Sequence, residues 1–338
     1  MSRPRRPQQH VERRPERRPA SAAAEWPVWL VALAPLVAAA IVHGNALTGF
    51  FASDDLDFLA RARGLDATVW GWSRPLPGRF RWELFTAWFG VQPFPHLLLA
   101  WLLHAGSALL VARIAVLAGL GRGVAFTAGV LVAGSSIVYS STHWASGLGE
   151  VMATAFALAA LALHLECRVR RRPRLAWLAG ASAACALLSK ESVLLLPLAV
   201  FAFDRLVPVR GEGQGALREI GWFGGLAGAA VVTAWIVSPH VAGEAYAFAP
   251  SPAALLVNLA TYGAWLVRLA APIRDRRAVP DPVLLPWGLG VMAVWAWAAW
   301  SERARPSRPM TAGLAWFALL LAPVVPLASH SYLYYLVT

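Results

Sequence analysis

Residues 26–46 read WPVWLVALAPLVAAAIVHGNA, and residues 50–58 follow shortly after as FFASDDLDF. About 20 consecutive, mostly apolar residues are enough to cross a bilayer as a helix. The first stretch therefore predicts a membrane-spanning helix. The second places three carboxylates, those of Asp54, Asp55 and Asp57, just beyond its far end.

The rest of the chain has the same apolar character. Of its 338 residues, 58% are hydrophobic and 14% are charged, and several further runs are long enough to span a bilayer. We therefore predict an all-α polytopic membrane protein. The net charge of +12 does not indicate nucleic-acid binding, because the arginines gather near the ends of apolar runs, where they set membrane orientation. The two cysteines, Cys167 and Cys185, support neither a disulfide framework nor a metal site.

Two regions are expected. Residues 1–25 are rich in proline and arginine and lack apolar periodicity, which predicts a disordered cytoplasmic tail. This tail is a simple topology anchor or a binder of anionic lipid head groups. Residues 26–338 form a single transmembrane domain in this prediction, with a long first outer loop at residues 49–93.

Alternation of loop charge predicts about nine transmembrane helices, with eight to ten as the range. The N-terminus is then cytoplasmic, the loop with Asp54 lies outside, and the protein resides in the cell (inner) membrane. Residues 250–273 either span the membrane or lie along its outer surface, and the second option is preferred. The nine spans are 26–46, 94–117, 124–140, 148–165, two short spans within 174–206, 220–237, 283–300 and 311–328.

The stretch 174–206 is too long for a single span. As one helix it would measure roughly 50 Å, against a hydrocarbon core of roughly 30 Å. Two short spans that turn at Ser189-Lys190-Glu191 keep the following basic loop inside. A charge at mid-membrane costs about 3 kcal/mol, so Lys190 and Glu191 are expected at an interface or a wet cavity.

Many polar residues fall on the outer side of this topology: Asp54, Asp55, Arg74, His143, Glu150, Lys190, Glu191 and Tyr332. Each has two interpretations. In one interpretation, Ser53 or Asp54 is the N-cap of a solvated helix, with Asp55 and Asp57 in its first turn. In the other, the aspartates form a catalytic carboxylate site. Lys190, the only lysine, either snorkels beside Glu191 or binds a lipid phosphate. Arg74 is likewise a phosphate ligand or a surface residue.

Two histidines are also ambiguous. His104 lies within the second predicted span, where it makes a helix–helix hydrogen bond or takes part in catalysis. His143, followed by Trp144, is an interfacial aromatic anchor or a ligand.

Taken in order, these residues resemble the GT-C glycosyltransferases. The similarity is to bacterial relatives of protein O-mannosyltransferases and to transmembrane mannosyltransferases with tetratricopeptide repeats, and it runs from about residue 45. It is carried by Asp54-Asp55, Arg74-Pro75-Leu76, Pro95-His96 with His104, His143-Trp144-Ala145-Ser146-Gly147, Leu187-Leu188-Ser189-Lys190-Glu191-Ser192 with Pro197, and Trp316-Phe317 through Tyr332-Leu333-Tyr334.

The chain departs from the family pattern in two respects. Ser331 stands where the family usually has an arginine before the final Tyr-Leu-Tyr. The family also usually continues with more spans. A short member, a fragment and an inactive relative all fit these departures.

The resemblance implies transfer of a sugar from a polyprenyl-phosphate carrier to a protein or glycan hydroxyl on the outer face of the membrane. Asp54, or else Asp55, would be the general base. Lys190 and Arg74 would stabilise the departing phosphate. Further pocket candidates are Glu191, His143, Glu150, His104 and Tyr332.

No cofactor or metal is required by this resemblance, although the carboxylates leave room for a divalent ion. Membrane lipids and the lipid-linked sugar are the expected partners. Two other functions remain open: a transporter or flippase of lipid-linked sugars, and a catalytically inactive membrane scaffold.

Overall fold

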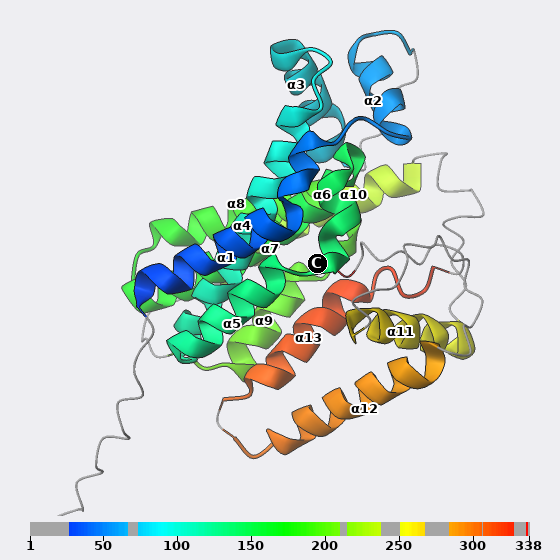
Figure 1. Ribbon diagram of the computed structural model, residues 1–338. Helices are drawn as coiled ribbons and strands as arrows, with labels where there is room; N and C mark the ends of the chain where they lie inside the picture. Colours follow the sequence, from blue (N-terminus) through cyan, green and yellow to red (C-terminus); the bar gives the residue numbers. More distant parts are fainter. Residues whose placement is uncertain are drawn as a thin grey trace, which may run out of the picture.

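The computed structural model describes residues 27–66, 74–209, 215–237, 251–267, 284–305, 307–327 and 336. Every regular element in these ranges is helical, so the all-α class is confirmed for them. The helices form an elongated bundle, with two short helices projecting at one end (Figure 1). The predicted tail, residues 1–25, and Tyr332 lie outside the described residues.

Four helical stretches of the described chain are long and apolar enough to cross a membrane: Val28–Thr48, Phe94–Leu117, Arg122–His143 and Ala145–Arg170. They coincide with the first four predicted spans. The number of spans beyond these four stays a prediction. The helices they contain are α1 (Val28–His43), η1 (Gly44–Thr48), α4 (Phe94–Leu117), α5 (Arg122–Ala133), η3 (Ser136–Val138), α6 (Tyr139–His143), η4 (Ala145–Gly147) and α7 (Leu148–Arg170).

Helix α7 is the centre of the bundle and packs against α4 and against α8 (Arg174–Ser189). Its contact with α8 is built from small residues, which let helix backbones approach closely where lipid surrounds the bundle. The buried alanines on the two helices include Ala153, Ala157, Ala160, Ala176, Ala179, Ala183 and Ala186.

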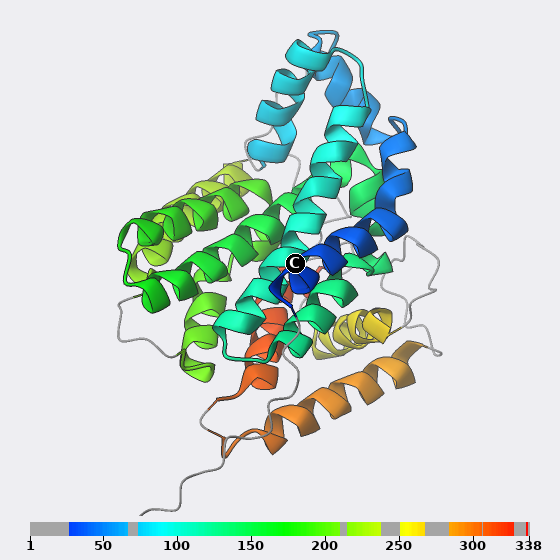
Figure 2. The same cartoon turned by 60° about the vertical axis from the view of Figure 1, so that its left-hand side comes forward.

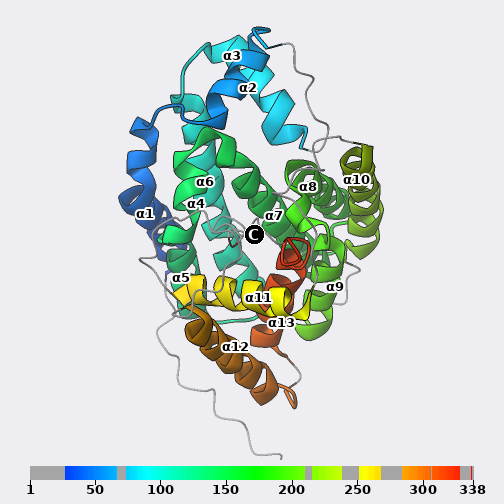
Figure 3. The same ribbon diagram turned by 90° about the vertical axis from the view of Figure 1, so that its right-hand side faces the viewer.

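The predicted break in residues 174–206 is present. Helix α8 ends at Ser189, a short turn η5 (Glu191–Val193) follows, and α9 (Leu196–Leu206) begins three residues later. Helix α9 then leaves α8 and packs against α10 (Leu217–Val237) and α13 (Pro309–Leu321), as Figure 3 shows. Pro197 of α9 packs closely against Gly224 of α10, because a Cβ at Gly224 would lie only 2.9 Å from Pro197 Cγ. This close contact positions α9 against α10.

Helices α11 (Pro252–Val267) and α12 (Leu284–Ser301) pack against each other near α13. The buried contact between α11 and the end of α13 includes Tyr262 and Leu321. Helix α11 has 16 residues, about 24 Å of helix, which is less than the hydrocarbon thickness. Residues 250 and 268–273 of the predicted surface segment lie outside the described residues.

The predicted outer loop, 49–93, contains helices rather than open chain. They are α2 (Asp54–Ala62), a π-helical turn η2 (Leu76–Phe80) and α3 (Arg81–Phe89). Trp82 is fully buried between Phe51 and Phe58, and the Phe58 ring stacks on it at 5.7 Å. Figures 1 and 2 show α2 and α3 together beyond one end of α4, which we call the loop end of the bundle.

Candidate functional site

Three segments meet where α7 begins, at the loop end of the bundle. They are η2, the first turn of α7 and the turn after α8. Gly149 permits this meeting, because a Cβ there would lie 3.3 Å from the Ser189 carbonyl oxygen and 3.4 Å from Pro77 Cγ. This contact brings together charged residues that are distant in sequence, such as Arg74 and Glu191.

Four of the predicted site residues form two ion pairs here. Lys190 Nζ lies 2.5 Å from Glu150 Oε1. Arg74 donates to both carboxylate oxygens of Glu191, with Nε 2.7 Å from Oε2. We call Arg74, Glu150, Lys190 and Glu191 the charge cluster. Its two cations and two anions sum to zero.

The first pair is buried and the second is partly exposed. Lys190 is 4% exposed and Glu150 is 3% exposed. Removing one partner of such a buried pair typically costs about 3–5 kcal/mol, because the other charge is left unpaired. Burial opposes ionisation of Glu191, but Arg74 and Lys190 outweigh burial and lower its pKa to about 2. Glu191 is therefore ionised throughout the physiological pH range.

This arrangement corrects the interpretation in which Lys190 and Glu191 pair with each other and snorkel at a turn. Lys190 has extended backbone angles, φ −158° and ψ 136°, and successive side chains of an extended chain point to opposite sides. Lys190 consequently turns inward to Glu150, whereas Glu191 turns to Arg74. Arg74 is likewise no free surface residue.

Asp55 and Asp54 have different surroundings, although they are adjacent. Asp55 is 0% exposed and accepts hydrogen bonds from the Ser146 backbone N–H at 2.7 Å, from the Ser146 hydroxyl, and from the Ala52 N–H at 3.0 Å. Ser146 lies one helical turn before Glu150. Asp55 thus fixes the start of α2 to η4, the turn immediately before α7, beside the charge cluster.

Asp54 is exposed in the first turn of α2, where the Ser53 hydroxyl lies 3.1 Å from its Oδ1. The predicted N-cap bond is absent, since the Ser53 side chain does not cap the helix. Instead, Ser53 has a φ of +49°, a conformation that typically costs about 1–3 kcal/mol in a non-glycine residue. Strain of this kind is common next to functional side chains.

The predicted histidines belong to a separate group. His104 Nε2 donates to the Ala133 carbonyl oxygen at 3.1 Å, which is the expected bond between neighbouring helices. His143 stacks on Tyr139, and its Nε2 lies 3.0 Å from Asn45 Oδ1. His43, which the sequence did not single out, lies between them, with ring centroids 5.0 Å from His104 and 6.0 Å from His143.

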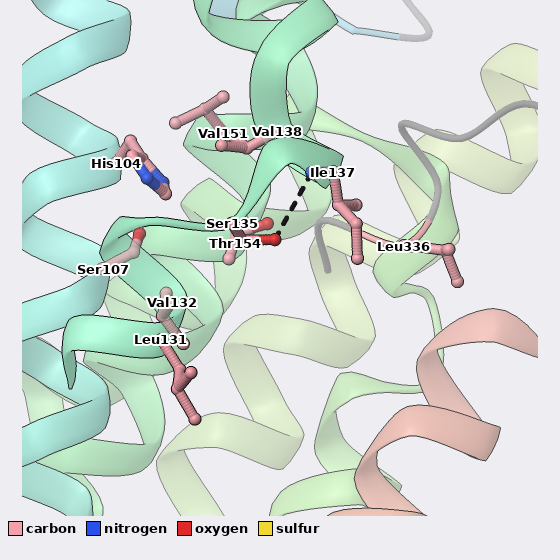
Figure 4. Close-up of a pocket in the computed structure, with 10 residues that line it drawn as sticks. All are labelled: His104, Ser107, Leu131, Val132, Ser135, Ile137, Val138, Val151, Thr154 and Leu336. Carbon is pink, nitrogen blue, oxygen red and sulfur yellow. Dashed lines mark hydrogen bonds between the residues drawn. The ribbon is translucent and has the colours of Figure 1, made fainter. Parts of the chain in front are cut away.

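A cavity of about 230 Å³ lies beside His104, between α4, α5 and α7 (Figure 4). Figure 4 shows His104 and Ser107 on one side and Leu336 on the other. Its wall is mostly aliphatic, which suits a hydrocarbon group better than a charged one. The lining residues are His104, Ser107, Leu131, Val132, Ser135, Ile137, Val138, Val151, Thr154 and Leu336.

Sequence reasoning missed two further groups at the loop end. Ser146 was noted only within a matching segment, and nothing in the sequence indicated its bonds to Asp55. Arg81 is 5% exposed, donates to the Pro77 carbonyl at 2.8 Å and to His96 Nδ1 at 2.6 Å, and lies over the Trp82 ring. Burial lowers the pKa of Arg81 to about 9, although Asp55 opposes this change.

Within the described part of the chain, no three His, Cys, Asp or Glu side chains are placed to hold a metal ion. Comparison with family models, with curated proteins and with solved structures finds no match.

Proposed function

We propose that the chain is a GT-C-like membrane glycosyltransferase that moves a sugar from a polyprenyl-phosphate donor to an acceptor hydroxyl. One observation supports this proposal most. An exposed carboxylate, Asp54, stands beside the Asp55–Ser146 anchor, and that anchor lies one helical turn from the buried Glu150–Lys190 pair. A base and two cations thus gather at one end of an apolar bundle.

The proposed reaction uses these residues in distinct roles. The acceptor oxygen bonds to the anomeric carbon as the bond from that carbon to the phosphate oxygen breaks, and polyprenyl phosphate leaves. Asp54 takes the proton of the acceptor hydroxyl. Lys190 and Arg74 stabilise the charge on the departing phosphate, since preorganised cations need little rearrangement as charge develops.

The proposal includes the finer membrane topology: about nine spans, a cytoplasmic N-terminus, and an outer location for the loop end in the cell membrane. It is tested with single cysteines at Ser2 and Ser53, in a protein whose native Cys167 and Cys185 are serines. On intact cells, an impermeant thiol reagent is expected to label position 53 but not position 2. Permeabilised cells should show both labelled. Labelling of position 2 alone on intact cells would reverse the topology.

The activity itself is tested with purified protein and radiolabelled polyprenyl-phosphate sugars, followed by mass spectrometry of the acceptor pool. Transfer of label to an acceptor is expected. Reconstituted vesicles give the decisive comparison. If the protein moves lipid-linked sugar across the bilayer and transfers none, the transporter function replaces this proposal. If it does neither, the scaffold function is the better one.

A further inference from the structure

One oxygen of the charge cluster has no hydrogen-bond partner in the part of the chain that the structure describes. Glu150 uses Oε1 for Lys190, whereas its Oε2 is buried and has no hydrogen-bond partner among the described residues. The hydroxyl of Ser192, two residues after Lys190, is also buried without a partner. A buried acceptor left without a donor typically costs about 1–3 kcal/mol, and more when it is charged. Such a cost is explained if a ligand supplies the donor.

The chemistry of the ligand group follows from the charges. A carboxylate oxygen only accepts hydrogen bonds, so the group must carry an O–H or N–H. Because Glu150 carries the negative charge, its orphan oxygen repels an anion placed in direct contact with it. A neutral hydroxyl meets both conditions. In the proposed donor, the polyprenyl tail and the phosphodiester carry no such group, whereas the sugar ring carries several.

We propose that Glu150 Oε2 accepts a hydrogen bond from a ring hydroxyl of the donor sugar and so determines which sugar is bound. This inference rests on the proposed function. There, Lys190 contacts the carrier phosphate, and the sugar is attached to that phosphate. In that function, Lys190 contacts both Glu150 and the carrier phosphate. Glu150 is then close to the sugar that is attached to this phosphate.

The test compares two lipids: a polyprenyl-phosphate sugar and the same polyprenyl phosphate without sugar. Glu150→Gln is expected to weaken binding of the sugar-bearing lipid about 10- to 100-fold, the usual range for a lost hydrogen bond to a charged group. Binding of the plain lipid should stay within about twofold. The variant keeps the shape of the side chain, and its amide oxygen stays toward Lys190, because an ammonium can only donate.

A donor series with single hydroxyls replaced by hydrogen gives an independent readout. The wild-type protein should lose affinity for one deoxy donor, whereas Glu150→Gln should bind that donor and the parent equally. This coupling isolates the contact from any general effect of the substitution. Glu166→Gln, at the opposite end of α7, is the matched control and should change neither affinity.

Three results would overturn the inference, and they differ from one another. Equal weakening of both lipids by Glu150→Gln makes Glu150 only the counter-ion of Lys190. Unchanged binding of both lipids means that water satisfies Oε2. If the folded wild-type protein binds neither lipid, the proposed function fails as well. Thermal melting of each variant shows that the comparison is made between folded proteins.

Discussion

Replacement of Asp54 by asparagine is expected to slow sugar transfer by about 10²–10⁴-fold, the usual contribution of a general base, while donor binding survives. Asparagine keeps the size of the side chain but loses the basic carboxylate. Because the Asp54 side chain is exposed and, within the described part of the chain, is hydrogen-bonded only to the Ser53 hydroxyl, the fold should tolerate the change. The measurements are transfer rate under saturating donor, donor affinity and melting temperature.

Asp57→Asn is the matched control for this prediction. Asp57 is also exposed in the first turn of α2, so the substitution removes the same charge from the same turn. Its transfer rate should remain near that of the wild-type protein. A rate loss as large as that of Asp54→Asn would point to the net charge of the loop and not to a base.

Asp55→Asn should behave differently. An amide in place of this carboxylate can no longer accept the bonds from Ser146 and Ala52 together, so the attachment of α2 to η4, just before α7, is weakened. A lower melting temperature should accompany any loss of transfer. If Asp55→Asn alone slows transfer while the protein melts as the wild type does, the base is Asp55. If the two single variants and the double variant all transfer at the wild-type rate, the mechanism is wrong.

The helical class and the first four spans could be predicted because they depend on local composition. The break after Ser189 was equally accessible, since Lys190 and Glu191 interrupt an apolar run that is too long for one helix. The packing of α9 against α10 could not be predicted from the sequence. It depends on the contact of Pro197 with Gly224, two residues from different helices.

At the candidate site, the sequence suggested which residues to consider but did not predict how they pair. The sequence does not distinguish Asp54 from Asp55. Only the contact with Ser146, 91 residues from Asp55, shows that the Asp55 carboxylate is buried and hydrogen-bonded whereas Asp54 is exposed. Lys190 and Glu191 are neighbours in sequence, yet the extended backbone at Lys190 sends them to different partners. Pairings of this kind arise from tertiary packing, which composition and spacing do not encode.

Lys190→Met is expected to have two separate effects. The protein should lose about 3–5 kcal/mol of stability, because Glu150 is left as a buried, unpaired charge. Binding of unglycosylated polyprenyl phosphate should weaken about 10- to 100-fold, because a charge-assisted hydrogen bond to the phosphate is lost. The first effect is measured by melting in detergent and the second by equilibrium binding of labelled lipid.

The double variant Lys190→Met/Glu150→Gln separates these effects. Removing both charges eliminates the unpaired carboxylate, so much of the lost stability should return. Phosphate binding should not return, since the ammonium is still missing. The lipid without sugar is the right probe here, because the loss of Glu150 should not affect its binding. Lys190→Arg keeps the charge but changes its geometry, so it should restore binding only in part.

The same double variant also shows how the proposed role of Lys190 can fail. If Lys190→Met/Glu150→Gln binds polyprenyl phosphate as tightly as the wild-type protein, Lys190 does no more than neutralise Glu150 within the bundle. Phosphate recognition would then fall to Arg74, whose pairing with Glu191 is the more exposed of the two. Arg74→Gln would in that case abolish binding, whereas under the present proposal it only weakens binding alongside Lys190.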